Sequence, residues 1–399
     1  MKRLPHGNNI NLKEGEFYNR SNELGRIKSL LETTEDGNAP DLLVTGIRGV
    51  GKSVLLKEVK KIFDEDYLVV YINFSYAEAF QTNNMSIFGL IDHYYQSIVD
   101  ECDKRNMGSF KEKVDKFLKT NDFHLKEFNN YNGIPLPVIE NETNLNKLNK
   151  FVLGFPQELY NSNNDKIKGV IIIIDEFQII KELGDYKEGF LWLLRGFMQE
   201  QNNVAYILSG SMSIYDKLIY EIAGKQGVFG GRLLTLQVEP FSKETTRNYL
   251  SEKLPELKFT DEGFDRFYKC TSGIPAYVNT FANELPLNEE LDGVNVLEEL
   301  DDNLDLLTSS LTTLWGRLKL NEQKILIALI NGPKMRKDIA KELNVASGSL
   351  SVYLNNLQDF QLIEFREGMY HISEPLLARW LEVEYNKRGI YPHRLIKYI

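Results

Sequence analysis

Cysteine and histidine are scarce in this chain of 399 residues, which contains two cysteines and five histidines. Cys102 and Cys270 lie far apart, so they do not form a pair with the spacing of a metal site. The histidines show no ligand spacing either. So few cysteines are typical of a reduced, cytoplasmic protein.

Long apolar runs are also absent. The longest run, GVIIIIDEF, has the length of a strand, whereas a membrane-spanning helix needs about 20 apolar residues. The first residues, MKRLPHGNNINLKEGEF, have a basic start without an apolar segment behind it, so we expect no secretory signal. We therefore expect a cytoplasmic protein that makes no membrane contact.

The sequence also lacks an excess of positive charge. It holds 57 acidic and 47 basic residues, which gives a formal net charge of -10. This balance argues against a protein whose whole surface binds nucleic acid, although a local basic patch is compatible with it. A hydrophobic content of 42% is typical of a folded protein, and the length favours two or three domains.

What the sequence does contain is a glycine-rich stretch, TGIRGVGKSVLL, at residues 45–56. Its spacing fits G-x-x-x-x-G-K-[ST], with an apolar strand pattern before it and a helical pattern after it. Backbone N–H groups can surround a phosphate only where no side chain intrudes, and the start of the helix adds partial positive charge. The stretch therefore predicts a phosphate-binding loop rather than a plain glycine turn.

The residues expected to bind nucleotide in this loop are Gly46, Arg48, Gly49, Val50, Gly51, Lys52, Ser53 and Val54. Lys52 would reach the β- and γ-phosphates, and Ser53 would offer its hydroxyl to Mg²⁺. The Arg48 side chain is expected to be exposed or to face a partner.

The matching carboxylates follow the apolar strand of GVIIIIDEFQ. Because this strand ends at Asp175, that residue is expected at the carboxyl edge of a parallel sheet, beside the phosphate loop. Asp175 would hold Mg²⁺ directly or through water, and Glu176 would orient and deprotonate the attacking water. The alternative for both residues is a solvated strand end.

Two further positions are catalytic candidates. Ser209, Ser211 and Ser213 lie in LSGSMS after another strand pattern, and we assign Ser211 as the sensor of the γ-phosphate, a plain turn being the alternative. Arg232, in FGGRLLTL, is a candidate arginine finger, in cis or across a subunit interface; a structural salt bridge is its alternative role.

Apolar strand patterns alternate with helical patterns in the first part of the chain, which predicts a parallel sheet covered on both faces. The expected strands are residues 41–46, 67–74, 169–175, 203–210 and 232–238. After them we expect a helical lid, and from about residue 321 three short helices, two short strands and a helical tail, which is the order of a winged helix. The expected domains are an α/β phosphate-loop domain (1–241), a helical lid with a connecting helix (242–319) and a winged-helix domain (320–399).

The motifs and their order resemble the P-loop ATPases of the AAA+/STAND group, in the ASCE division, and especially the archaeal-type ATPases with a winged helix. The matching segments are FYNRSNEL (17–24), TGIRGVGKS (45–53), IIIIDEFQ (171–178), GGR with VEPFS (230–242) and TSGIPAYV (271–278). The resemblance implies strand order 5-1-4-3-2, a helical lid and Mg-ATP as ligand. It also adds Arg20, from the opening segment, and Pro275, near the adenine, to the expected nucleotide-binding residues. The polar segment 105–165 departs from the pattern and is assigned no function.

The expected winged helix has few of the positive charges that bind the phosphates of DNA. Its third helix, SGSLSVYLNNLQD, contains no lysine or arginine, and residues 321–375 hold six basic and seven acidic side chains. Asn355, Asn356 and Gln358 could still read bases, and Arg336 and Lys337 could contact a DNA backbone.

Three functions therefore remain open. The first is a slow Mg-dependent ATPase that acts as a nucleotide switch and couples its ATP or ADP state to the winged helix. The second is an ATP-dependent DNA-binding regulator or initiator-like protein with duplex DNA as its partner. The third is an interaction scaffold in a signalling or defence system with a protein partner. A homo-oligomer is compatible with each.

Overall fold

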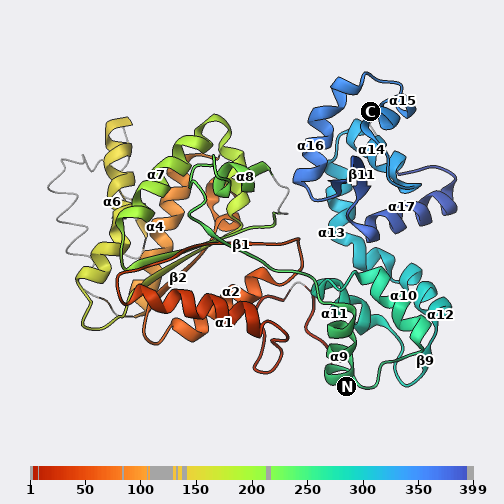
Figure 1. Ribbon diagram of the computed structural model, residues 1–399, viewed down its shortest axis with the longest axis horizontal. Helices are drawn as coiled ribbons and strands as arrows, with labels where there is room; N and C mark the ends of the chain where they lie inside the picture. The colour runs from red at the N-terminus through yellow and green to blue at the C-terminus, as the bar shows by residue number, and fades with distance from the viewer. Residues whose placement is uncertain are drawn as a thin grey trace. The chain divides into compact units, whose positions relative to one another are not determined.

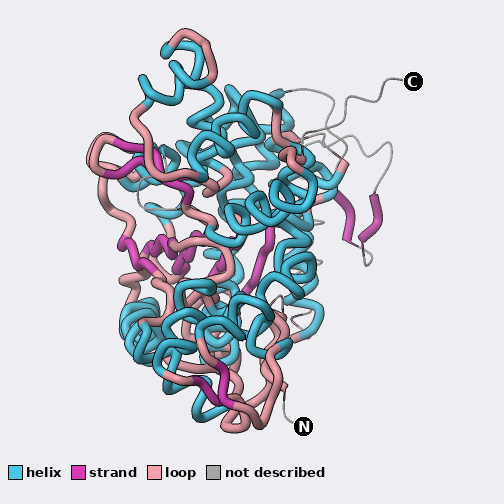
Figure 2. The backbone as a smooth tube through the Cα atoms, turned by 90° about the vertical axis from the view of Figure 1, so that its right-hand side faces the viewer, coloured by secondary structure: helices cyan, strands magenta, loops and turns pink. Residues whose placement is uncertain are grey.

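The computed structural model describes residues 3–7, 9–82, 85–105, 107, 129–131, 134–136, 142–212 and 217–392. The chain forms two compact units. The sheet unit consists of residues 20–46 and 52–238, and the C-terminal unit consists of residues 1–19, 47–51 and 239–399. Each unit has a hydrophobic core of its own. Helices make up most of the described chain (Figure 2).

The sheet unit is built on a five-stranded parallel sheet with the order β2-β5-β6-β1-β7. Counted along the chain, this is the predicted order 5-1-4-3-2, which is confirmed together with the α/β fold. Every residue of β5 and β6 is buried, which explains why both strands are continuous apolar runs in the sequence. The strands are β1 (Asp41–Thr45), β2 (Leu68–Asn73), β5 (Val170–Asp175), β6 (Val204–Ser209) and β7 (Leu234–Gln237).

Helices cover both faces of this sheet. In Figure 1, α1 and α2 lie on one side of it, and α4, α6 and α7 lie on the other. Two short strands, β3 (Asn129–Tyr131) and β4 (Ile134–Leu136), form a separate antiparallel pair. The helices of this unit are α1 (Ser21–Leu31), η1 (Glu32–Thr34), α2 (Lys52–Phe63), η2 (Phe74–Tyr76), α3 (Glu78–Gln81), α4 (Ile87–Lys104), α6 (Glu142–Asn161), η3 (Phe177–Tyr186), α7 (Lys187–Glu200) and α8 (Lys217–Ala223).

The C-terminal unit is mainly helical. It begins with α9 (Lys243–Lys253), β8 (Lys258–Phe259), α10 (Asp261–Thr271), α11 (Pro275–Glu284), β9 (Glu290–Leu291), α12 (Gly293–Asp302) and α13 (Leu304–Arg317). It continues with α14 (Leu320–Ile330), α15 (Arg336–Glu342), η4 (Ser347–Leu350), α16 (Ser351–Asp359), β10 (Ile363–Arg366), β11 (Met369–Ile372) and α17 (Pro375–Arg388). Strands β10 and β11 pair as an antiparallel hairpin. Within the described ranges, no helix is long and apolar enough to cross a membrane.

The N-terminal segment packs into the C-terminal unit. The Leu4 N–H donates to Asn283 Oδ1 (2.9 Å), and Asn283 Nδ2 donates back to the Leu4 carbonyl (3.0 Å). The Tyr18 ring lies against Phe241 and Tyr249, with ring centroids 6.2 and 5.0 Å away. Leu4 and Tyr18 therefore contribute to a core that is otherwise formed by residues beyond 240.

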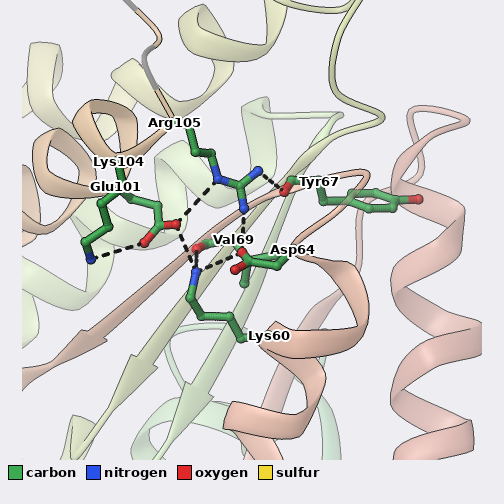
Figure 3. A network of polar contacts seen from close by, with 7 residues as sticks. All are labelled: Lys60, Asp64, Tyr67, Val69, Glu101, Lys104 and Arg105. Carbon is green, nitrogen blue, oxygen red and sulfur yellow. Dashed lines mark hydrogen bonds and ion pairs between the residues drawn. The ribbon is translucent and has the colours of Figure 1, made fainter.

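A network of ion pairs fastens α4 to α2 and to the edge strand β2 (Figure 3). The Lys60 ammonium lies 3.1 Å from the Glu101 carboxylate and donates to the Val69 carbonyl (2.6 Å). The Arg105 guanidinium lies 3.4 Å from Glu101 and donates to the Tyr67 carbonyl (2.7 Å). Because Glu101 is only 8% exposed, these cations compensate a carboxylate that would be costly to bury alone.

We expect Asp41, the first residue of β1, to make the stability of the fold depend on pH. Burial raises the pKa of its carboxyl from 3.8 to about 7. Between these two values the folded chain holds a proton that the unfolded chain has released, so stability falls as pH rises through this window. We expect Asp41→Asn to remove a slope of up to about 1.4 kcal/mol per pH unit from the free energy of unfolding.

Urea unfolding at several pH values between 5 and 8 measures this slope. The exposed Asp36 is the matched control, because Asp36→Asn should keep the pH dependence of the wild type. A constant difference between Asp41→Asn and wild type across the whole range would contradict the expectation.

Candidate functional site

The carboxyl ends of the central strands bring the predicted site residues of the sheet unit together. Lys52 and Ser53 begin α2 after the loop that follows β1, and Ser211 lies just beyond β6. The Lys52 ammonium, in a side chain that is 6% exposed, donates to the Gly46 carbonyl (2.9 Å) and to Ser211 Oγ (3.2 Å). A buried positive charge therefore lies at the edge where open parallel sheets bind ligands.

Asp175, the last residue of β5, is 1% exposed and accepts hydrogen bonds at both carboxylate oxygens. Oδ2 accepts from Ser53 Oγ (2.6 Å) and from Tyr71 Oη (2.5 Å), and Oδ1 accepts from the Glu176 N–H (3.0 Å). The predicted pair of Ser53 and Asp175 is thus in direct contact.

Tyr71 is a site residue that the sequence analysis missed. Burial and, second, the nearby charge of Asp175 raise the pKa of its phenol well above the ordinary value, so it stays a hydrogen-bond donor. The Lys57 ammonium lies 5.8 Å from the centre of the Tyr71 ring. The signal in the sequence was a tyrosine within the apolar run of β2. Strand β2 pairs with β5, and in this pairing Asn73 lies opposite Asp175.

The Ser53 and Asp175 oxygens suit a hard cation. Mg²⁺ prefers oxygen ligands and is usually held by one or two protein groups together with waters and substrate phosphates. Ser53 Oγ and Asp175 Oδ2 lie 2.6 Å apart, so both could contact the same ion directly or through water. Among the described residues there is no cluster of three or more His, Cys, Asp or Glu side chains that would form a richer metal site.

Glu176 has a left-handed backbone conformation (φ 56°, ψ 37°), which is uncommon for a residue with a side chain. Such conformations persist where the surrounding contacts impose them, and they cluster at functional sites. Its carboxylate accepts a hydrogen bond from Gln178 Nε2, and Gln178 Oε1 accepts from the Ser211 N–H (3.2 Å). Gln178 is the second residue that the sequence analysis missed, although it belongs to the quoted motif IIIIDEFQ.

The loop between β1 and α2 has the glycine conformations that a phosphate-binding loop requires. Gly46, Gly49 and Gly51 have φ values of 148°, 80° and 99°. Within the C-terminal unit, the Gly49 carbonyl accepts from the Ala276 N–H (3.2 Å). Pro275, the residue before Ala276, is the first residue of α11, so loop and helix start lie side by side in that unit.

The other predicted binding residues lie in varied surroundings. Arg48 is exposed, and its backbone N–H donates to Gln361 Oε1 (3.2 Å) within the C-terminal unit. Val50 is fully buried, whereas Val54 is half-buried on α2. Arg20 is 6% exposed just before α1, with Nη1 3.0 Å from Glu23 Oε1.

Among the residues that the structure describes, no contact joins Arg232 or Ser209 to the Lys52 and Asp175 cluster. Arg232 is exposed and contacts the Gln199 side chain. With its oxygen turned toward the two arginines, the Gln199 amide accepts hydrogen bonds from Arg232 and from Arg195 Nε (3.1 Å). Ser209 is buried, and its hydroxyl has no hydrogen-bond partner in the part of the chain that the structure describes. Ser213 lies outside the described residues.

Comparison with known proteins agrees with this arrangement. A family model described as an ATPase domain predominantly from Archaea matches residues 17–281. The chain belongs to this archaeal ATPase family.

Two proteins of Methanocaldococcus jannaschii, both described as uncharacterized ATP-binding proteins, are 24% and 23% identical to the chain. The matches span 81% and 84% of this chain, and 85% and 88% of those proteins. Among solved structures, a Walker-type ATPase of Pyrococcus abyssi is similar in fold, with a TM-score of 0.64 and 20% sequence identity. That similarity covers 93% of this chain and 98% of the other.

Two loop glycines differ in what an added methyl group would meet. A Cβ on Gly49 would lie 3.0 Å from Ala276 Cβ and 3.1 Å from Ile274 Cγ2, whereas one on Gly51 would meet nothing within 4 Å. We expect Gly51→Ala to lower the free energy of unfolding by about 1–2 kcal/mol through backbone strain, and Gly49→Ala by roughly twice as much.

Urea unfolding of the purified variants measures both losses. Gly25, inside α1 and without neighbours at the Cβ position, is the matched control. There alanine should raise stability by about 0.5–1 kcal/mol. Equal losses at Gly49 and Gly51 would show that the contact with α11 does not constrain the loop.

Proposed function

We propose that this protein binds ATP at residues 46–54 and hydrolyses it slowly with Mg²⁺, acting as a nucleotide switch. The observation that carries the proposal is the convergence of Lys52, Ser53, Asp175 and Glu176 at one edge of the sheet, after a loop with glycine conformations. Phosphoryl transfer depends on positioning and on charge neutralisation, and these residue types supply both.

Each residue has a specific task in this proposal. Lys52 exchanges its contacts with Gly46 and Ser211 for the β- and γ-phosphates. Ser53 and Asp175 hold Mg²⁺, which neutralises phosphate charge when it is bound. Glu176 takes a proton from the attacking water while the water oxygen bonds to the γ-phosphorus and the bond to the ADP oxygen breaks.

The remaining predicted residues complete the proposed nucleotide site. The loop amides around Arg48 and Val50 bind phosphate, and Val54 stabilises the start of α2. Arg20, in the sheet unit, binds the nucleoside. For Pro275, the first residue of α11, a nucleoside contact stays a prediction from the family resemblance. Ser211 acts as a sensor because it already contacts Lys52. Arg232 is exposed and bonded to Gln199, so we assign it to the nucleotide of a second copy in a homo-oligomer.

The switch role is supported by a contact that the loop makes within the C-terminal unit. The Gly49 carbonyl accepts from the Ala276 N–H at the start of α11. A ligand that reorders this loop therefore acts on residues that pack with α11. We propose that α14 to α17 form a winged helix that presents this change to a partner.

A protein is a better candidate for this partner than duplex DNA. The Arg336 guanidinium, a candidate for DNA contact, donates to the carbonyls of Ser347 (2.8 Å) and Gly348 (3.2 Å). Asn356, a candidate base reader, donates to Glu322 Oε1 (3.0 Å). Both side chains are thus engaged in contacts within residues 320–359. Fewer groups of this part of the chain are therefore available for phosphates and base edges.

Two substitutions separate binding from hydrolysis. Lys52→Ala should weaken ATP binding by about 10- to 100-fold, because it removes a charge-assisted contact with phosphate. Glu176→Gln should keep binding and lower kcat by roughly 10²- to 10⁴-fold, because it removes the base. Binding is measured with a fluorescent ATP analogue, and turnover by phosphate release with Mg²⁺.

Lys61→Ala is the matched control on the same helix, since this lysine is exposed and pairs only with Glu58 among the described residues. Turnover of Glu176→Gln at the wild-type rate would remove Glu176 as base. A several-fold acceleration of wild-type turnover by duplex DNA at low salt would favour the DNA-dependent alternative over a protein partner.

A further inference from the structure

Gln178 connects two groups of the site that are distant in sequence. Its Nε2 donates to the Glu176 carboxylate, and its Oε1 accepts from the backbone N–H of Ser211, 3.2 Å away. The chemistry fixes this orientation of the amide, because a carboxylate can only accept and a backbone N–H can only donate. A carboxylate or a hydrocarbon at position 178 cannot make both contacts.

These contacts extend to the phosphate-loop lysine. The Ser211 hydroxyl accepts from Lys52 Nζ (3.2 Å), and Lys52 also donates to the Gly46 carbonyl (2.9 Å). Glu176 is therefore linked through Gln178 to the backbone N–H of Ser211, and the hydroxyl of the same Ser211 is linked to Lys52. All of these residues belong to the sheet unit.

Gly210 leaves the space in which the Gln178 amide lies. A Cβ at this position would come within 2.4 Å of Gln178 Oε1 and 2.9 Å of Met212 Cε. The φ of Gly210 is not in the left-handed region, so backbone conformation does not require glycine there. Glycine is required at position 210 because the Gln178 amide lies where a side chain would begin.

We propose that Gln178 is a positioning residue for ATP hydrolysis: it orients the Glu176 carboxylate and makes that orientation depend on the Ser211 loop and on Lys52. This inference rests on the proposed function. When Lys52 turns to phosphate, the Ser211 hydroxyl loses its donor, and Gln178 carries the resulting shift of the loop to the base. Glu176 is thereby aligned for water only when the phosphate loop is filled.

The left-handed backbone of Glu176 gives this control a physical basis. A residue with a side chain is strained in this region and is held there by its surroundings. The hydrogen bond from Gln178 holds the carboxylate end of the same residue. Loss of that bond allows other side-chain rotamers, and a base must lie within hydrogen-bond reach of the water that it deprotonates.

Two variants of Gln178 test the proposal by steady-state phosphate release and by the pH dependence of kcat. Gln178→Met keeps the approximate volume and removes both hydrogen bonds, so kcat should fall by roughly 10- to 100-fold. Gln178→Glu places a second carboxylate beside Glu176, so the acid limb of the kcat–pH profile should move upward by about one pH unit. The Kd for ATP should stay within about threefold of wild type, because phosphate contacts are intact.

Gly210→Ala is an independent test that leaves Gln178 in place. The added methyl group displaces the amide, so this variant should lower kcat to a similar extent. Combining it with Gln178→Met should give little further loss, because both changes remove one and the same interaction.

Gln157→Glu is the matched control. Gln157 also accepts a backbone N–H, from Asn203 (3.2 Å), but Asn203 precedes β6 and lies at the opposite end of that strand from Ser211. This variant should keep the wild-type kcat and pH profile. Thermal melts of all variants show whether each is folded.

The outcomes separate the two proposals. Wild-type protein that releases no more phosphate than Glu176→Gln overturns the proposed hydrolysis, and the role of Gln178 with it. Active wild type with folded Gln178 variants at wild-type kcat overturns the role of Gln178 alone. A lower kcat in Gln178→Glu with an unmoved acid limb and a lowered melting temperature would assign Gln178 to stability only, and would also overturn the proposal.

Discussion

The buried charge of Asp175 is the constraint on which the rest of the site depends. A carboxylate that is 1% exposed must have its charge compensated by hydrogen bonds, since an unpaired one would be neutralised or would destabilise the fold. The three donors come from the start of α2, from β2 and from the backbone at Glu176. Because all three donors must reach Asp175, the start of α2, the edge strand β2 and Glu176 are fixed in position around it.

Lys52 is the positive counterpart at the same sheet edge. Its ammonium is held by a carbonyl and a hydroxyl oxygen, both of them neutral groups. Hydrogen bonds to neutral oxygens are weaker than those to charged groups, so an anionic ligand can replace these two contacts. The site thus combines a hydrogen-bonded carboxylate with a buried ammonium group, and these are the two kinds of charge that a metal–phosphate ligand requires.

Much of the fold and of the site could be predicted from the sequence. The strands and the glycine loop are local patterns, and the strand order came from the family resemblance. Tyr71 and Gln178 were missed because their roles depend on contacts that no local pattern contains. Tyr71 matters because β2 pairs with β5, and Gln178 because the turn after Asp175 brings it beside the Ser211 loop.

The packing of Leu4 and Tyr18 has a consequence for how the chain is made. Both are synthesised before the sheet unit, whereas their partners Phe241, Tyr249 and Asn283 follow more than two hundred residues later. At typical elongation rates the delay is on the order of ten seconds or more. The sheet unit, whose residues are contiguous apart from the loop, can assemble during that interval. Leu4 can make its hydrogen bonds with Asn283 only after translation has passed α11.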